Sequence, residues 1–346
     1  MLSVELGLDD FSASNGWLDR FQKRHNISCS VLSGEGASVN EEMVNDWCSR
    51  LESMCEGYSL KDIFNANETG LFNRALPTRS QVIRSDKCHR GKNSKERITV
   101  LLGCSAMGKK HTPLVISRAA NPRCFRGNST SSLPVTYQAN KRAWMTSTIF
   151  KDWLQKLNNK MTLEKRKIIM FVDNCAAHPA MTLSNVKLVF LPPNTTARLQ
   201  PCDGGIIKAV ISTYRKKPLC HILLKMNEAS TAADLAGKGT VLDAISWLKY
   251  AWDCVQAETI QKCFAHCGFI FATAPTASAD ATETAPAELL LLLQGSSWAD
   301  FIECDNEVTA TTEVFGVVET APEVEEETKT LTASHISARQ TLTLKK

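Results

Sequence analysis

Two aspartates and one asparagine stand at positions where acidic side chains would together hold a metal ion. Asp173 ends an apolar run that begins at Ile168, and Asp203 follows the segment Gln-Pro-Cys. Upstream, Asn67 lies in the segment Phe-Asn-Ala-Asn-Glu-Thr-Gly. Acids placed at the ends of several strands are how a chain builds a divalent-metal site for phosphodiester chemistry. Two of the three positions carry an acid, and the third carries an amide.

The amide at position 67 limits the chemistry. Two-metal hydrolysis holds its cations about 3.5–4 Å apart, and the carboxylate between them must neutralise charge. An asparagine offers one neutral carbonyl oxygen and an NH₂ group that repels cations. Glu68 is adjacent, but consecutive side chains of a strand point to opposite faces, so it replaces Asn67 only with a bulge or a register change. A non-catalytic alternative is that Asp173 and Asp203 are simply turn or cap formers.

Charge is divided unevenly along the 346 residues. The net charge is +4, yet residues 272–346 carry 13 acidic and 4 basic side chains, so residues 1–271 carry a net +13. The composition, 43% hydrophobic and 22% charged, is that of ordinary globular protein. A basic body with an acidic tail suits a nucleic-acid partner, and a solvated surface with a disordered tail is the alternative.

Thirteen cysteines are scattered without a C-x-x-C pair. Cys263, His266 and Cys267 come nearest to a metal cluster, but adjacent residues of a helix point in different directions, so we expect no zinc there. We expect reduced thiols in an intracellular protein. The apolar run Leu289–Leu293 is too short to span a bilayer.

Hydrophobic periodicity predicts a mixed α/β sheet with acids at strand ends and on the final helix of the sheet domain. Helices are expected over residues 14–28, 41–56, 146–160, 203–214, 258–267 and from 240 onwards. Strands are expected over residues 63–66, 97–105, 111–117, 167–173 and 186–191. Beyond residue 272 the chain is rich in Ala, Thr and Glu, and we expect most of this acidic tail to be disordered.

Several of these segments together resemble the DDE-type transposase domain of the pogo/Tigger family, which includes the Tigger-derived, jerky and centromere protein B proteins. The resemblance covers residues 60–270. It is carried by Ile63–Phe72, Arg97–Ser117, Phe171–Pro179, Val189–Thr196, Gln200–Asp203 and Leu242–Phe269. Residues 15–28 also resemble the last helix of a centromere-protein-B-type helix-turn-helix module.

The resemblance implies an RNase H-like fold, a nuclear location, DNA as ligand and an aspartate triad that binds Mg²⁺. By position, Asp173 and Asp203 match the second and third acids, and Asn67 stands at the first. Gly204 occupies a position where the family usually has glutamine. Most of the family's helix-turn-helix region has no counterpart in the chain, which puts sequence-specific DNA binding in doubt.

The predicted domain boundaries follow from this resemblance. We expect residues 1–30 to be the remnant of the helix-turn-helix domain, 31–59 a helical linker and 60–225 the DDE endonuclease domain. Residues 226–271 would extend that domain with helices, and residues 272–346 would form the tail.

Basic side chains in two segments are the candidate DNA contacts. The N-terminal helix supplies Arg20, Lys23, Arg24 and His25, and the segment before the second predicted strand supplies Arg84, Lys87, Arg90, Lys92 and Lys95. Arg118, Arg123 and Arg126 form a third basic loop. For each loop the alternative is a solvated basic surface. His178 is expected to pack after the strand that ends at Asp173, with contact to a scissile phosphate as the alternative.

These observations predict a nuclear DNA-binding protein derived from a transposase, with a degenerate catalytic site. Asp173 and Asp203 would hold Mg²⁺ weakly or vestigially, and cleavage would be absent or crippled. We expect neither a membrane nor a small-molecule substrate as partner, and leave a homo-oligomer open. Two competing hypotheses are an active Mg²⁺-dependent endonuclease, with Glu68 or Asp62 as the missing acid, and an interaction scaffold without DNA affinity.

Overall fold

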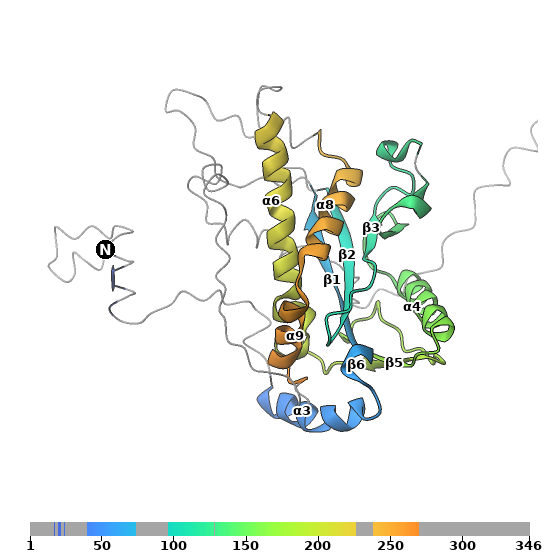
Figure 1. Cartoon of the computed structure of the whole chain (residues 1–346), viewed down its shortest axis with the longest axis vertical. Coiled ribbons are helices and arrows are strands. Elements are labelled where there is room, and N and C mark those ends of the chain that lie inside the picture. Colours follow the sequence, from blue (N-terminus) through green and yellow to red (C-terminus); the bar gives the residue numbers. More distant parts are fainter. Residues whose placement is uncertain are drawn as a thin grey trace, which may run out of the picture. The chain divides into compact units, whose positions relative to one another are not determined.

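A computed structural model describes residues 40–73, 96–127, 129–225 and 238–269, with four further residues of an N-terminal helix (Figure 1). Those four are Trp17, Arg20, Phe21 and Arg24, of which Trp17 and Phe21 stack with their ring centroids 5.0 Å apart. The acidic tail, most of the predicted linker and most of the predicted DNA contacts lie outside the described residues. These contacts are Lys23, His25, Arg84, Lys87, Arg90, Lys92 and Lys95.

The described part of the chain forms a six-stranded sheet in the order β4-β3-β2-β1-β5-β6. Strand β2 runs antiparallel to β1 and β3, while the β3–β4, β1–β5 and β5–β6 pairs are parallel. This order, with the long β1 in the middle, is the RNase H-like mixed sheet that the sequence predicted. The strands are β1 Ile63–Phe72, β2 Arg97–Ser105, β3 Leu114–Ser117, β4 Thr136–Ala139, β5 Ile168–Val172 and β6 Val186–Phe190.

Because of these strand directions, most strands of the sheet end at the same edge. The carboxyl ends of β1, β3, β4, β5 and β6 lie at the same edge as the amino end of β2, where Arg97 pairs with Phe72 of β1. We refer to it as the carboxyl edge. Loops that follow these strands therefore leave the sheet in the same direction, although β5 ends level with Ala66, before β1 ends at Phe72.

Helices cover both faces of the sheet (Figure 1). Three of these helices begin at a residue that caps them: Asn40 accepts from two backbone amides of α3, Thr146 caps α4, and Thr240 forms a capping box with Asp243 on α8. The helices are α3 Glu41–Cys55, α4 Ser147–Leu163, α5 Thr196–Leu199, α6 Ile207–Lys225, α8 Val241–Cys254 and α9 Ala257–His266, with 3₁₀ turns at Leu60–Asp62, Arg123–Phe125 and Thr130–Ser132.

Alternation along the strands divides the core into two layers. Ile63, Leu71 and Phe171 point to the face covered by α3, α6, α8 and α9. Phe64 and Ala66 point to the opposite face, which α4 covers. Asn65 and Asn67 are two and four residues after Ile63 in the same strand. Their side chains therefore point to the same face as Ile63, which packs against α6 and α9.

The structure corrects several predicted boundaries. Strand β1 was expected over residues 63–66 but runs to Phe72, because β2 pairs with it along nine residues. The short, half-buried β4 was missed, because it lacks an apolar run. The helix expected at Asp203 begins instead as a π-helical turn, Cys202–Ile206, in which Gly205 has a φ of 137°, and α6 starts only at Ile207.

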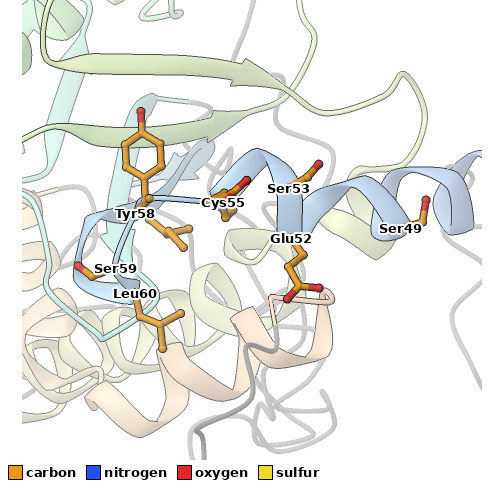
Figure 2. A pocket seen from close by; sticks show the side chains of 10 residues that line it. Ser49, Glu52, Ser53, Cys55, Tyr58, Ser59 and Leu60 are labelled. Carbon is orange, nitrogen blue, oxygen red and sulfur yellow. The ribbon is translucent and has the colours of Figure 1, made fainter.

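Helix α3 and the turn after it border a shallow hollow of about 670 Å³ (Figure 2). Its walls include Glu52 and Ser53 of the helix and Tyr58, Ser59 and Leu60 of the turn. None of Asn67, Asp173 and Asp203 lines it. Among the described residues, no helix has both the length and the apolar character needed to cross a membrane.

His111 is buried against the ring of Phe64, with the two ring centroids 4.5 Å apart. Burial, assisted by the charges of Lys160, Lys109 and Arg166 and opposed by Glu164, lowers the pKa of His111 to about 4. The folded protein therefore binds fewer protons than the unfolded chain between pH 6.5 and 4, and this contribution to stability is lost as the pH falls through that window.

We predict that the free energy of unfolding decreases by about 3 kcal/mol between pH 6.5 and 4 through His111 alone. The variant His111→Gln removes this titration, so its stability should depend less on pH in that window. Urea unfolding of both proteins at several pH values measures the difference. Equal pH profiles would contradict a neutral, buried His111.

Candidate functional site

Asn67 and Asp203 are in direct contact at the centre of the candidate site. Asn67 Nδ2 donates a hydrogen bond to Asp203 Oδ1 at 2.8 Å, across 136 residues of sequence. Asn67 is buried on β1, and Asp203 lies in the π-helical turn that precedes α6. The amide thus presents a donor to the carboxylate, where an acid would present a second anion.

Asn65 places the Asp203 turn against the sheet. Its Nδ2 donates to the backbone oxygen of Phe171 at 2.9 Å and to Gln200 Oε1 at 3.2 Å, and its Oδ1 accepts from the backbone N–H of Cys202 at 2.9 Å. Asn65 is fully buried. One amide therefore ties β1 to β5 and to the residue before Asp203, which fixes where that carboxylate lies.

Asp173 reaches the same site from β5. Asn65 pairs with Phe171 in the parallel β1–β5 ladder. Asp173 is two residues beyond Phe171, so the register places it level with Asn67. His178 Nδ1 lies 2.6 Å from Asp173 Oδ1, and His178 Nε2 lies 3.0 Å from Glu68 Oε1. Burial alone would lower the pKa of His178, but the carboxylates of Glu68 and Asp173 outweigh it and raise that pKa well above its ordinary value.

Glu68 is therefore committed to His178 rather than to Asp203. Its side chain points to the face of β1 opposite that of Asn67, as the strand alternation requires. Phe150 of α4 packs on the other side of the imidazole, with ring centroids 4.2 Å apart. His178 was predicted as a packing residue, but its position between two carboxylates was not predicted.

Asp62, the other acid considered as a replacement, lies at the opposite edge of the sheet. It precedes β1, and Arg166, which precedes β5, donates from Nε to Asp62 Oδ1 at 3.0 Å. Hydrogen bonds from Ser59 and Arg166, together with the nearby Arg166 and Lys61 charges, outweigh burial and lower the pKa of Asp62. Asp62 is thus held in an ion pair away from Asn67 and Asp173.

Gly204 and Gly205 have a packing reason to be glycine. A Cβ on Gly204 would lie 3.3 Å from Cys267 Sγ, and a Cβ on Gly205 would lie 3.2 Å from Cys263 Sγ. Cys263 Sγ also donates to the Gly204 carbonyl at 3.5 Å. Helix α9 therefore packs closely against the Asp203 turn, and a glutamine at position 204 would require the thiol to move.

Arginines gather at the carboxyl edge, beyond the acids. Arg97 begins β2, Arg118 follows β3, and Arg142 follows β4. Arg97 and Arg142 both lie over the ring of Trp144, at 4.9 and 5.2 Å from its centroid. Burial, and to a smaller extent the charge of Arg118, lower the pKa of Arg97. We call Arg97, Arg118 and Arg142 the arginine cluster.

The remaining predicted basic residues are exposed where the structure describes them. Arg20 and Arg24 are exposed on the N-terminal helix, and Arg123 and Arg126 are exposed near the 3₁₀ turn after β3. Arg142 was not predicted as a site residue, because the loop after the unpredicted β4 carries it together with Trp144. A strand prediction over Thr136–Ala139 would have placed them at the carboxyl edge.

The residues present fit a two-metal Mg²⁺ site poorly. Magnesium prefers charged oxygen ligands in octahedral geometry. Here Asn67 directs an N–H group at Asp203, and Asp173 faces the imidazole of His178. We therefore derive no catalytic step through such an ion.

We predict that Asn65→Ala lowers the free energy of unfolding by about 2–4 kcal/mol, because it leaves the Cys202 N–H and the Phe171 carbonyl buried without this partner. Urea unfolding measures the loss. Asn159 is exposed on α4, so Asn159→Ala is the matched control and should change stability by less than about 0.5 kcal/mol. Equal effects of the two substitutions would show that Asn65 does not anchor the turn.

Comparison with known proteins agrees with this arrangement. A family model described as DDE superfamily endonuclease matches residues 95–264, and one described as Tc5 transposase DNA-binding domain matches residues 2–31. The Tigger transposable element-derived protein 4 of Mus musculus is 37% identical over 268 residues, which cover 77% of this chain and 51% of that protein. The major centromere autoantigen B of Homo sapiens is 32% identical over 300 residues, covering 78% and 47% respectively.

The chain spans about half the length of these curated relatives. Among solved structures, the Mos1 mariner paired end complex with Mn aligns with a TM-score of 0.44 and 12% identity over 78% of this chain and 70% of that one. Both family models, the relatives and the predicted motifs point the same way. The chain belongs to the pogo/Tigger-type family of transposase-derived proteins.

Proposed function

We propose that this protein binds DNA in the nucleus at the carboxyl edge of its sheet and does not cleave it. The observation that carries the proposal is the hydrogen bond from Asn67 Nδ2 to Asp203 Oδ1. In a DDE-type site the first acid would meet Asp203 as a second negative charge, and a cation between them would be needed to offset the repulsion. The amide removes both the charge and the need for a cation.

The arginine cluster supports DNA as the ligand. Arg118 and Arg142 are exposed after β3 and β4. The strand register places Arg118 level with Phe72 and Asp173 level with Asn67, on the other side of β1. A phosphodiester chain that ran across the sheet from Asp173 would reach these guanidinium groups. Arginine is suited to phosphate, because its planar group donates two parallel hydrogen bonds. The arginines would then hold DNA at a site that has lost its hydrolytic metals.

An active endonuclease would need another acid beside Asp203. Glu68 is buried against His178, and Asp62 is paired with Arg166 at the opposite edge, so neither contacts Asp203 in this arrangement. The nuclear location rests on the family and on DNA as the proposed ligand. Self-association is an additional proposal, which sedimentation with and without DNA would test.

We predict that the native chain leaves supercoiled plasmid uncut in Mg²⁺ or Mn²⁺, while Asn67→Asp restores nicking above the native background. The restored activity should disappear in a protein that also carries Asp173→Ala. Gel electrophoresis of the plasmid measures all three. Cleavage by the native chain that vanishes in Asp173→Ala would overturn the proposal in favour of an active endonuclease.

We also predict that Arg118→Ala with Arg142→Ala weakens DNA binding and reduces the slope of log K against log salt by about 2, since each phosphate contact contributes about 0.9. Fluorescence anisotropy at several salt concentrations measures the slope. Lys151→Ala with Lys160→Ala is the control, because these exposed lysines lie on α4 rather than at the carboxyl edge. Absence of any binding by the native chain would favour the protein-interaction scaffold.

A further inference from the structure

The turn after β5 gathers three different metal ligands. Asp173, Cys175 and His178 each place one ligand atom so that the three atoms lie within 4.8 Å of one another. The backbone N–H of His178 donates to the Cys175 carbonyl at 3.0 Å, which closes the turn and brings the two side chains together. We propose that this turn binds one divalent cation of borderline softness, of the zinc or cobalt type, through Asp173, the Cys175 thiolate and His178 Nδ1.

Glu68 supplies the outer support that such a site requires. Histidine ligands of metals nearly always donate their other ring N–H to a carboxylate or a carbonyl, which fixes the tautomer and turns the free nitrogen to the ion. His178 Nε2 lies 3.0 Å from Glu68 Oε1, and both side chains are almost completely buried. This contact leaves Nδ1, the nitrogen nearest Asp173, as the ligand atom.

Two carboxylates face His178: Asp173 Oδ1 lies 2.6 Å from Nδ1, and Glu68 Oε1 lies 3.0 Å from Nε2. Among the described residues, the second oxygen of Glu68, Oε2, is buried and has no hydrogen-bond partner. Buried anionic oxygens are costly unless positive charge lies near them, and a bound cation supplies that charge. The two carboxylates are a separate observation from the spacing of the three ligands, and they favour positive charge beside His178.

The types of ligand select the class of ion. An oxygen, a nitrogen and a sulfur ligand suit zinc and its neighbours, while magnesium prefers oxygen alone. Binding would displace the Nδ1 proton of His178 and the thiol proton of Cys175. Asp173, Glu68 and the Cys175 thiolate then carry three formal negative charges, so a dication leaves a net charge of −1. Around a tetrahedral ion the ligand atoms lie about 3.4–3.6 Å apart, so Asp173 and His178 must separate by roughly 0.8 Å.

The separation of Asp173 from His178 would come from movement of side chains on the exposed side of the turn. Asp173 is 22% exposed and Cys175 is half-buried, whereas the ring of His178 is held by Phe150 and Glu68. The exposed side leaves a fourth position for water. The inference goes beyond the proposed function and does not depend on DNA binding or on the absence of cleavage.

Titration of the metal-free full chain with Co²⁺ tests the proposal, because a cobalt–thiolate bond gives a near-ultraviolet charge-transfer band and tetrahedral cobalt gives strong visible bands. We expect both to saturate at one ion per chain, to be displaced by Zn²⁺ and to persist in excess Mg²⁺. Since the chain has 13 cysteines, variants must locate the thiolate.

The substitution Cys175→Ser should abolish the charge-transfer band, and because Cys175 is partly exposed the fold should persist, which far-ultraviolet circular dichroism checks. Cys254→Ser is the matched control, another partly exposed cysteine outside the cluster, and should retain the bands. Glu68→Gln should weaken binding by about 10–100-fold. A folded native chain without a saturable band, or a band that survives Cys175→Ser, would overturn the proposal.

Discussion

The hydrogen bond between Asn67 and Asp203 is the interaction on which the account of this site depends. In an acidic triad the carboxylates repel one another, and the site is complete only when cations lie between them. Here a neutral donor meets Asp203 directly at 2.8 Å, so the first and third positions are satisfied within the protein. One change from carboxylate to amide thus converts a pair that requires metal into a pair that does not.

The surrounding structure holds Asp203 and Asp173 in place on the two sides of β1 and β5. Asn65 still binds β5 and the turn before Asp203, and the π-helical turn still delivers that carboxylate to the sheet. On the other side of β1, Glu68 and Phe150 hold His178 against Asp173. The fold needs these contacts for packing whether or not the site is catalytic, because burying Asn65 or His178 without partners would be costly.

How much of this could be predicted from sequence differs between elements. The apolar runs of β2 and β5 are local signals, so the mixed sheet and the position of Asp173 directly after a strand were predicted correctly. Asn67 instead lies within β1, which extends to Phe72, and Asp203 lies in the π-helical turn before α6. The contacts of Asn65 and His178 join residues more than 100 positions apart and depend on the β1–β5 register, which no local pattern records. The half-buried β4 gives no apolar run, and without it Arg142 could not be assigned to the carboxyl edge. Glu68 was assigned correctly to the opposite face of β1, but its partner there was not foreseen.

The affinity for Mn²⁺ tests the central claim most directly, because it measures the site without requiring DNA or turnover. Electron paramagnetic resonance of free Mn²⁺ would compare Asn67 with Asn67→Asp, both in a Cys175→Ser background so that the thiolate of the β5 turn does not contribute. The account predicts that the aspartate protein binds Mn²⁺ at least about 10-fold more tightly, since the added carboxylate supplies charge and oxygen ligands to the ion. Equal affinities in the two proteins would contradict the claim that the amide at position 67 is what disables the metal site.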